Sequence, residues 1–411
     1  MRIFKKWTGE SEVTKNLYLL LIIGGLYSLS VALSSTFVNI YLWKQSGKFL
    51  DIGIFNLSIV VLQPLTFIFA GRLAKKVDRI IVLRLGVTFL SLFYMCVLAV
   101  GTKAEDYLVL LGGLLGIGYG FYWLAFNVLT FEITEPDTRD YFNGFMGILS
   151  SSGGMIGPVL AGFIISRFEK FTGYSIVFGL SLSLFTIAVL LSLSIKRRPA
   201  QGKYSFGRIW QERKHDMNWR LITYANFFQG LREGTFSFII SVFVFLSTGS
   251  EMALGHFGLI NSGVSFMAYY FASKFIKPSM KKKSILIGGL LLYGSVFLIV
   301  HNPTYMKLLL YAAVIAVAYP VLLVPYVSLT FDTIGNAWKA AEMRVEYIVV
   351  REVCTNLGRV ISVLSFILAI TFFDERVSIP VLLLILGAGH SCIYFFVRKI
   401  ELPSAVAPIK R

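Results

Sequence analysis

The chain has 411 residues, of which 56% are hydrophobic and 15% are charged, and its formal net charge at pH 7 is +17. An average soluble chain is about 45–50% apolar and about 25% charged, so a soluble enzyme, a disordered protein and a disulfide scaffold are all excluded. At about 20 residues for each membrane crossing, the apolar residues suffice for roughly ten to twelve spans of a polytopic membrane protein.

Twelve apolar stretches, separated by polar segments, follow one another along the chain. Inside lipid, a helix satisfies all the backbone polar groups of such a stretch within itself. We therefore predict an all-α polytopic membrane protein with twelve transmembrane helices. The expected spans are residues 16–43, 51–73, 80–101, 107–132, 141–166, 173–195, 219–246, 252–276, 284–301, 306–331, 344–372 and 379–397.

Lysine and arginine are distributed unevenly between the two sides of the predicted helices. If the N-terminus is cytoplasmic, the segments on that side carry 28 of these residues and the opposite segments carry seven. The positive-inside rule then predicts a cell-membrane protein with both termini in the cytoplasm. Because the basic residues are spread over short loops, nucleic acid is not an expected partner.

The longest hydrophilic segment, residues 196–218, lies between the sixth and seventh spans and divides the chain into two halves, 1–195 and 219–411. Ser205 is placed to cap a short amphipathic helix that would lay Phe206, Ile209 and Trp210 at the membrane interface. A solvated linker is the alternative.

The two halves show an internal repeat. Residues 119–132 align without a gap with residues 319–332, and residues 71–86 lie over residues 273–288. Repeats in the same order indicate two six-helix bundles in parallel orientation, a plan found in secondary transporters.

Two motifs accompany this plan. The loop between the second and third spans, GRLAKKVDRI from Gly71, is similar to the pattern G-x-L-A-D-R-x-G-R-K, except that Lys75 replaces the Asp and Asp78 the second Gly. The fifth span contains a run of small residues, GGMIGPVLAG from Gly153, similar to the pattern G-x-x-x-G-P-x-x-G-G. Small residues four apart let helices approach closely, and the helix-packing set is Gly153, Gly157, Pro158 and Gly162.

With these motifs and the two sets of six helices, the chain resembles the major facilitator superfamily over essentially its whole length. The resemblance implies two bundles that rock about a midplane site. It also implies that the loop after Gly71 latches the two halves on the cytoplasmic side, with Lys75 in place of the latching Asp.

Polar and charged residues within the seventh span mark a candidate site. A charge at the bilayer centre costs about 2.5–3.5 kcal/mol on insertion scales, so it usually has a partner or a function. Asn226, Gln229 and Glu233 share one stripe, with Arg232 at its edge. We interpret Glu233 as a protonatable site and Arg232 as its partner or as an anion contact. The alternative is a neutralised pair that only braces the helices.

The eleventh span carries a second polar face, with Glu352, Asn356 and Arg359. Arg359 would either contact substrate or brace the fold with Glu352 and Glu233. Three further candidates for the substrate cavity are Asn127, Tyr119 and Tyr319.

Gating residues are expected where helices four and ten end. Glu132 and Asp332 lie at helix C-termini, where the helix dipole disfavours an anion, so each needs a basic partner. Arg139 and Arg344 are near in sequence and would serve. The remaining gating candidates come from the loop motif: Gly71, Asp78 and Arg79.

These features predict a secondary transporter that works by alternating access. The first hypothesis is proton-coupled export of a small amphiphilic or drug-like compound, and the alternative is uptake or exchange of a small organic anion. A membrane-embedded enzyme or lipid-handling protein is the other class, but no nucleophile–base pair, metal spacing or ATP-binding motif is found. We expect no catalytic residue, cofactor or metal. The expected partners are the bilayer, a small-molecule substrate and protons, and the expected state is a monomer.

Overall fold

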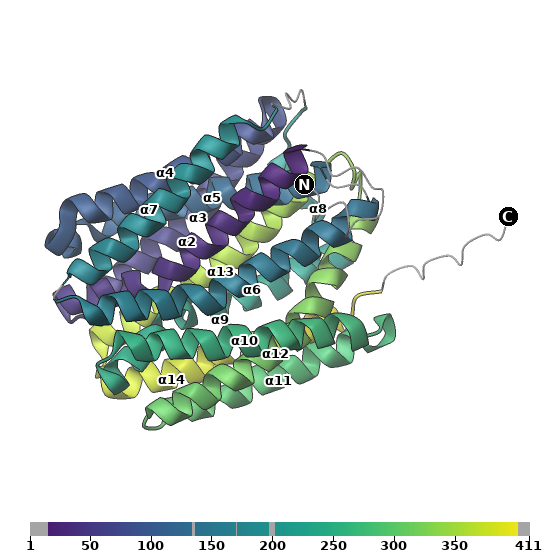
Figure 1. Ribbon diagram of the computed structural model, residues 1–411. Coiled ribbons are helices and arrows are strands. Elements are labelled where there is room, and N and C mark those ends of the chain that lie inside the picture. The colour runs from purple at the N-terminus through teal and green to yellow at the C-terminus, as the bar shows by residue number, and fades with distance from the viewer. Residues whose placement is uncertain (1–14, 134–135, 170, 197–201, 402–411) are drawn as a thin grey trace.

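The structure is a computed structural model that describes residues 15–133, 136–169, 171–196 and 202–401, without the side chains of residues 131–144 (Figure 1). Every regular element in these residues is helical. The first half contains α2 (Lys15–Ser46), α3 (Phe49–Lys76), α4 (Arg79–Val100), the 3₁₀ helix η1 (Gly101–Tyr107), α5 (Leu108–Ile133), α6 (Pro136–Arg167) and α7 (Thr172–Leu193). The second half contains α8 (Phe206–Glu212), α9 (Met217–Thr248), α10 (Glu251–Phe275), the 3₁₀ helix η2 (Pro278–Met280), α11 (Lys281–Val300), α12 (Tyr305–Asn336), α13 (Arg344–Phe372), α14 (Glu375–Gly387) and α15 (Gly389–Val397).

Each of the twelve predicted spans is helical, and the all-α fold is confirmed. Ten segments of the described chain are long and apolar enough to cross a membrane, of which Arg79–Thr130 runs through both α4 and α5, while α10 is not among the ten. The last span differs from the prediction, because the helix is interrupted at Ala388 and forms α14 and α15. Glycine flanks the break on both sides, and Gly389 lies so close to α9 that a Cβ there would meet the Phe228 carbonyl oxygen at 2.6 Å.

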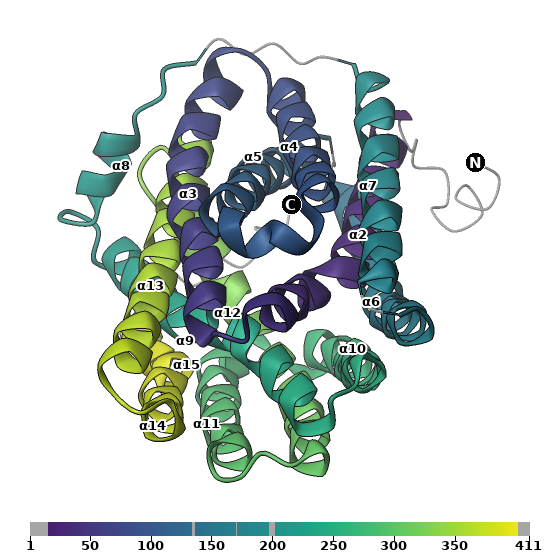
Figure 2. The same ribbon diagram turned by 90° about the vertical axis from the view of Figure 1, so that its left-hand side faces the viewer.

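The long helices run back and forth between the two ends of the bundle, so that the described chain begins and ends at the same end (Figure 1). We call the end with Lys15 and Val397 the near end, and the end with Ser46 and Phe49 the far end. Viewed from the far end in Figure 2, the helices of the first half lie beside those of the second. The halves meet where α3 packs along α13 and α6 packs along α10.

Small residues bring these helices together. On α6, Gly157 faces α2, since a Cβ there would lie 2.8 Å from the Ala32 carbonyl carbon. Further along α6, Gly162 faces α10, where a Cβ would lie 2.7 Å from the Glu251 carbonyl oxygen, and Pro158 touches α10 at Gly258. Gly153 also faces α2. The motif in the fifth span therefore packs one helix against neighbours in both halves.

The internal repeat is visible in the packing. Gly86 of α4 approaches the backbone of α5 at Tyr122, and a Cβ there would lie 2.5 Å from the Tyr122 amide nitrogen. In the second half, Gly288 of α11 approaches α12 in the same way, with 2.7 Å to the Leu322 amide nitrogen. The two aligned glycines thus hold corresponding helix pairs together.

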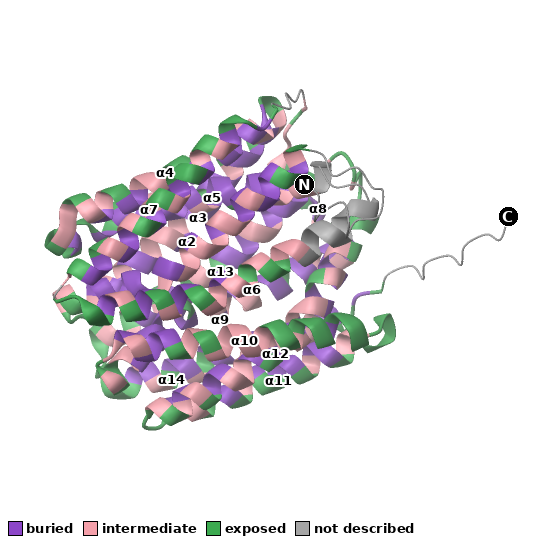
Figure 3. Ribbon diagram, in the orientation of Figure 1, coloured by how far each residue is buried: buried purple, intermediate pink, exposed green. Residues whose placement is uncertain are grey.

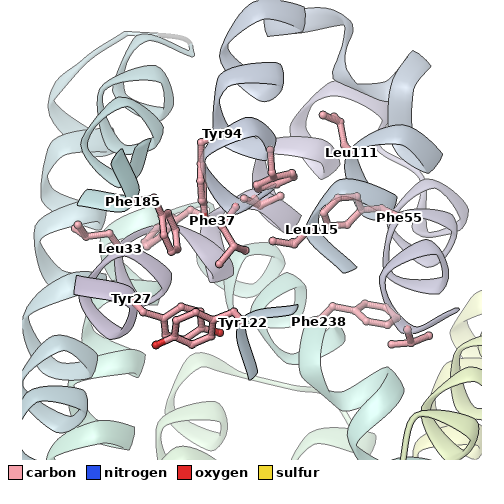
Figure 4. Packing of buried hydrophobic residues seen from close by; sticks show 14 of the residues in the cluster. Tyr27, Leu33, Phe37, Phe55, Tyr94, Leu111, Leu115, Tyr122, Phe185 and Phe238 are labelled. Atoms are coloured by element: carbon pink, nitrogen blue, oxygen red, sulfur yellow. The ribbon is translucent and has the colours of Figure 1, made fainter. Parts of the chain in front are cut away.

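Large side chains fill the interior, and the exposed residues lie mainly on the outward faces of the helices (Figure 3). In the first half, the rings of Tyr27 and Tyr122 stack on each other (Figure 4). Their centroids are 3.9 Å apart. Exposed apolar residues on the outside, such as Leu190 and Phe297, suit a surface that faces lipid.

The segment between the halves contains the short helix α8. Ile209 is fully buried, and its carbonyl oxygen accepts a hydrogen bond from the Trp219 indole nitrogen at 3.2 Å. Of the two interpretations of this segment, a helix therefore forms, and it packs against the start of α9. The expected cap is wrong in detail, since Ser205 precedes the helix without a capping hydrogen bond from its side chain.

The crossing of α9 and α13 provides a first test of this packing. A Cβ on Gly230 would lie 1.8 Å from the Thr355 carbonyl oxygen, and neither backbone can move alone. We expect Gly230→Ala to lower the free energy of unfolding by about 3 kcal/mol, at the upper end of overpacking costs. The measurement is thermal unfolding in detergent. The matched control is Gly294→Ala in α11, where a Cβ would meet nothing within 4 Å; equal melting temperatures for the two variants would contradict the close crossing.

Candidate functional site

A cavity of about 790 Å³ lies between the two halves. Its lining residues come from α2 to α6 of the first half and from α9, α10, α12 and α13 of the second. On α9 they run from Arg232, halfway along the helix, to Ser241, nearer the far end. On α2 and α3 they likewise lie in the halves of the helices nearer the far end. The cavity therefore extends from the middle of the bundle toward the far end.

A four-residue network joins three helices at the floor of this cavity. The Glu233 Oε2 atom of α9 accepts from Arg359 Nη2 of α13 at 2.6 Å and from Arg359 Nε at 3.2 Å. The Glu233 Oε1 atom accepts from Tyr319 Oη of α12 and from Gln229 Nε2, both at 2.8 Å. Four donors of this kind stabilise a carboxylate in its charged form.

Arg232 has a different environment from its neighbour Glu233. It is 4% exposed, its Nη2 atom lies 3.5 Å from Tyr311 Oη, and its guanidinium stands 4.6 Å from the Phe236 ring centre. Its Nε atom is buried and has no hydrogen-bond partner, and no carboxylate of the described side chains lies within 4 Å of the guanidinium. A buried cation without a counterion is costly, so this side chain is poised to accept an anion.

The opposite wall of the cavity carries uncharged polar groups. Asn56 of α3 donates to Asn39 of α2 at 2.8 Å, and Gln63 and Tyr119 line the cavity beside them. Sequence reasoning missed the three amides. A signal was present in the sequence, because amide side chains inside predicted spans are uncommon. The sequence analysis gave priority to the charged residues instead. Together, these groups suit hydroxyl or carbonyl groups of a hydrophilic ligand.

The structure brings five of the predicted substrate-site residues to the cavity: Tyr119, Arg232, Glu233, Tyr319 and Arg359. Gln229 is not in the lining but binds Glu233 from the same helix. The remaining three, which also lie outside the lining, are Asn127, Asn226 and Glu352.

Two of these three have clear positions. Asn226 is buried between α9 and α13, where it accepts from Thr355 at 3.5 Å. Glu352 forms an ion pair with its neighbour Arg351. Of the two carboxylates expected beside Arg359, the structure pairs it with Glu233 and not with Glu352.

At the near end, an ion pair connects the halves. Lys75 Nζ of α3 lies 2.5 Å from Glu346 Oε1 of α13, and the two side chains are 12% and 0% exposed. Lys75 stands where the superfamily pattern has Asp, so the cross-bundle contact exists with a lysine on the first half. Sequence reasoning did not find Glu346, because the partners are 271 residues apart.

The segment before α8 covers this ion pair. The Ser205 amide donates to Glu346 Oε1 at 3.1 Å, and the Gly202 amide donates to the Lys75 carbonyl at 3.0 Å. Gly71 leaves room for Tyr204, whose hydroxyl would lie 2.8 Å from a Cβ at that position. Burial, with the nearby Glu346 carboxylate, raises the pKa of Tyr204, so its hydroxyl stays un-ionised.

The other gating candidates have local roles in the described structure. Asp78 caps α4 by accepting from the Ile80 amide at 2.7 Å, and Arg79 begins that helix. Asp332 pairs with Lys281 of α11 at 2.8 Å, and Arg344, the basic partner expected for it, begins α13. The side chains of the remaining two candidates, Glu132 and Arg139, lie outside the described residues.

A second ion pair connects the halves at the far end. Lys44 Nζ of α2 lies 2.8 Å from Glu251 Oε1 of α10, and Tyr174 of α7 donates to the same oxygen at 2.9 Å. We call this cluster the far-end pair and the contact of Lys75 with Glu346 the near-end pair.

Among the residues that the structure describes, no group of three or more His, Cys, Asp or Glu residues is arranged to hold a metal ion.

A bundle of apolar helices in two halves, with a polar midplane cavity and ion pairs at both ends, is the architecture of a membrane transporter. The model of the Major Facilitator Superfamily matches residues 20–363, and the chain belongs to this family. It is therefore a multi-pass membrane protein of a transporter family. The family assignment indicates a transporter and not an enzyme.

Relatives and solved structures agree with this assignment. The chain is 61% identical over 401 residues to the "Uncharacterized protein YqgE" of Bacillus subtilis (strain 168), covering 98% of this chain and 93% of the relative. Crystal structures of the nucleoside transporter NupG (TM-score 0.70, 14% identity) and the human organic anion transporter MFSD10 (0.66, 13%) have the same fold. They align with 94% and 93% of this chain, and with 100% and 98% of their own. The E. coli fucose:proton symporter FucP (0.62, 16%) aligns with 93% of this chain and 97% of its own.

Proposed function

We propose that this protein takes up or exchanges a small hydrophilic organic anion by alternating access. The observation that carries the proposal is Arg232, a buried cation that faces the cavity without a counterion. A carboxylate or similar anion at this position would form charge-assisted hydrogen bonds with the guanidinium.

The rest of the lining supports a ligand with further polar groups. Asn39, Asn56 and Gln63 stand on the wall across from the charged helices, and Ser237 and Asn261 add hydroxyl and amide groups. These groups bond partly to one another and to backbone carbonyls, and an amphiphilic drug-like compound would leave their remaining hydrogen-bonding capacity unused, at a cost of about 1–3 kcal/mol for each unpaired group. The lining therefore favours the anion over the export of amphiphiles.

Alternating access would use the two ion pairs between the halves. Breaking the near-end pair while the far-end pair persists would open the cavity toward one side, and the reverse would open it toward the other. We place both termini in the cytoplasm, because 28 of the lysines and arginines fall on that side of the predicted topology. We also propose that the protein is a monomer in the cell membrane. The division into halves at 196–218 is part of the same proposal.

The test is binding by the purified protein in detergent, measured as thermal stabilisation with a panel of probe solutes. The panel contains D-gluconate, L-malate, nicotinate, a neutral sugar, a nucleoside and a cationic dye. We expect stabilisation by at least one carboxylate, and we expect Arg232→Gln to weaken its binding by about 100-fold or more, as for a lost charge-assisted contact.

The matched control is Arg84→Gln, which removes an arginine that donates to backbone carbonyls at the end of α7, away from the cavity. This variant should bind the carboxylate like the wild type. Stabilisation by the cationic dye alone, unaffected by Arg232→Gln, would reject the anion and favour the export of amphiphiles.

A further inference from the structure

Beside the candidate site lies a buried histidine that the site so far does not use. His390, the second residue of α15, is 0% exposed, and both ring nitrogens are buried without a hydrogen-bond partner among the described residues. Its ring stands edge-on to Tyr319, with centroids 5.4 Å apart. Tyr319 lines the cavity and donates to Glu233. A titratable group therefore sits one side chain behind the cavity wall.

The break in the last helix places this histidine against Arg232. A Cβ on Gly389 would lie 3.2 Å from the Arg232 amide nitrogen and 3.3 Å from its Cβ. The start of α15 consequently rests on the backbone of Arg232, and the Tyr319 ring that the imidazole contacts is the one whose hydroxyl binds Glu233.

The elements packed against α15 contribute few other charges. From α9 they are Arg232 and Glu233, and from α12 the group is Tyr319. The stretch of α11 beside α15, from Ser284 to the residue before Tyr293, has no titratable side chain, and α14 ends in apolar residues before Gly387. Arg359 of α13 acts on this region through its ion pair with Glu233.

These surroundings oppose a positive charge on the imidazole of the empty protein. Burial disfavours a charged imidazolium, and the unpaired guanidinium of Arg232 repels a second positive charge. The negative charge of Glu233 opposes this repulsion weakly, because Arg359, Tyr319 and Gln229 already engage both carboxylate oxygens. An anion on Arg232 removes the unbalanced positive charge, and the balance then shifts toward the imidazolium.

We propose that His390 is the proton-binding group of the transporter and takes up one proton when an anion binds Arg232, an inference that rests on the proposed anion transport. The proton comes from water and forms an N–H bond on the free ring nitrogen. It leaves to water when the anion departs. Glu233 keeps its charge throughout, held by its four donors.

The charge balance of the site gives this coupling a reason. Two arginines and Glu233 leave the empty site with a net charge of +1. A bound monoanion alone would bring the net charge to zero, whereas a monoanion together with a proton on His390 restores +1. The loaded and the empty cavity then reorient with the same charge, so neither step carries an extra electrostatic cost across the membrane.

The first experiment observes His390 directly and needs no substrate. The chain contains four histidines, so NMR of the histidine-labelled protein in nanodiscs, with His390→Asn for assignment, isolates this ring. Removing the positive charge with Arg232→Gln mimics its neutralisation. We expect the His390 ring to become protonated at a pH higher than in the wild type by about one unit or more, whereas Arg84→Gln leaves it unchanged. Equal titration in the wild type and Arg232→Gln would overturn the proposal.

The second experiment measures coupling in proteoliposomes with the probe anions D-gluconate, L-malate and nicotinate. In the wild type, we expect acidification of the outside to accelerate uptake by about tenfold for each pH unit, as for one coupled proton. In His390→Asn, this acceleration should vanish while exchange between labelled and unlabelled anion continues. If acidification of the outside still accelerated uptake in His390→Asn, that result would refute the role of the histidine. A wild type that carries none of the probes would count against the proposed function, and the NMR titration would still decide the role of His390.

Discussion

Glu346→Lys is expected to hold the near end of the transporter open. In the wild type, Lys75 and Glu346 form a buried ion pair between α3 and α13, and the substitution would place a second positive charge beside Lys75. An uncompensated buried charge costs about 3–5 kcal/mol. We therefore expect the population with a closed near end to fall by about 100-fold or more.

Cysteine accessibility measures this change. The reporter is Ser262→Cys, which lines the cavity on α10, in a chain whose native Cys96, Cys354 and Cys392 are replaced by serine. A membrane-impermeant maleimide applied at the near end should label this reporter much faster in Glu346→Lys than in the parent chain.

Two further variants make the test specific. The exchange Lys75→Glu with Glu346→Lys restores an ion pair of opposite direction and should return labelling from the near end toward the parent rate. Glu251→Gln weakens the far-end pair with Lys44 and Tyr174, and it should raise labelling from the far end instead. Unchanged labelling in Glu346→Lys, or no recovery in the exchange variant, would show that this pair does not close the near end.

Glu233→Gln and Arg359→Gln are each expected to abolish transport and to lower stability by about 3 kcal/mol, the lower end of the cost for a buried pair, because each leaves a partly buried charge without its partner. The double variant separates function from bracing. With both charges gone, neither side chain is left as a charge without a partner. The melting temperature of the double variant should therefore recover most of what each single variant loses. Transport of the probe anions should stay absent, since the network at the cavity floor is missing.

The matched control is the pair Arg351→Gln with Glu352→Gln, which removes a neighbouring ion pair of α13 that does not line the cavity. That variant should transport normally. A transport-competent double variant at Glu233 and Arg359 would assign these residues to bracing alone. The readouts are uptake in proteoliposomes and thermal unfolding in detergent.

Much of the fold and part of the site could be predicted from the sequence. Apolar stretches of bilayer length leave no alternative to helices, so all twelve spans were placed. Charges within spans are rare because they are costly, which singled out Arg232, Glu233 and Arg359. Their separate roles could not be predicted, because only the three-dimensional structure shows that Arg359 takes the carboxylate and leaves Arg232 without one.

The contacts between the halves were beyond sequence reasoning. Lys44 and Glu251 are 207 residues apart, and a single chain contains no local signal for such a partner. His390 was passed over for a related reason. One histidine in the last span is unremarkable until the helix break brings it against Arg232 and Tyr319.

The two ion pairs between the halves differ in their contact with water, so we expect the ionic strength of the surroundings to weaken them to different extents. Lys44 is 32% exposed in the far-end pair, whereas Lys75 is 12% exposed and Glu346 fully buried in the near-end pair. Dissolved ions screen exposed charges over about 8 Å at physiological ionic strength, but they screen buried charges much less. A more saline medium at the far end would therefore loosen one closure and leave the other intact. At high ionic strength, the protein without substrate would therefore spend more of its time in the conformation that is open at the far end.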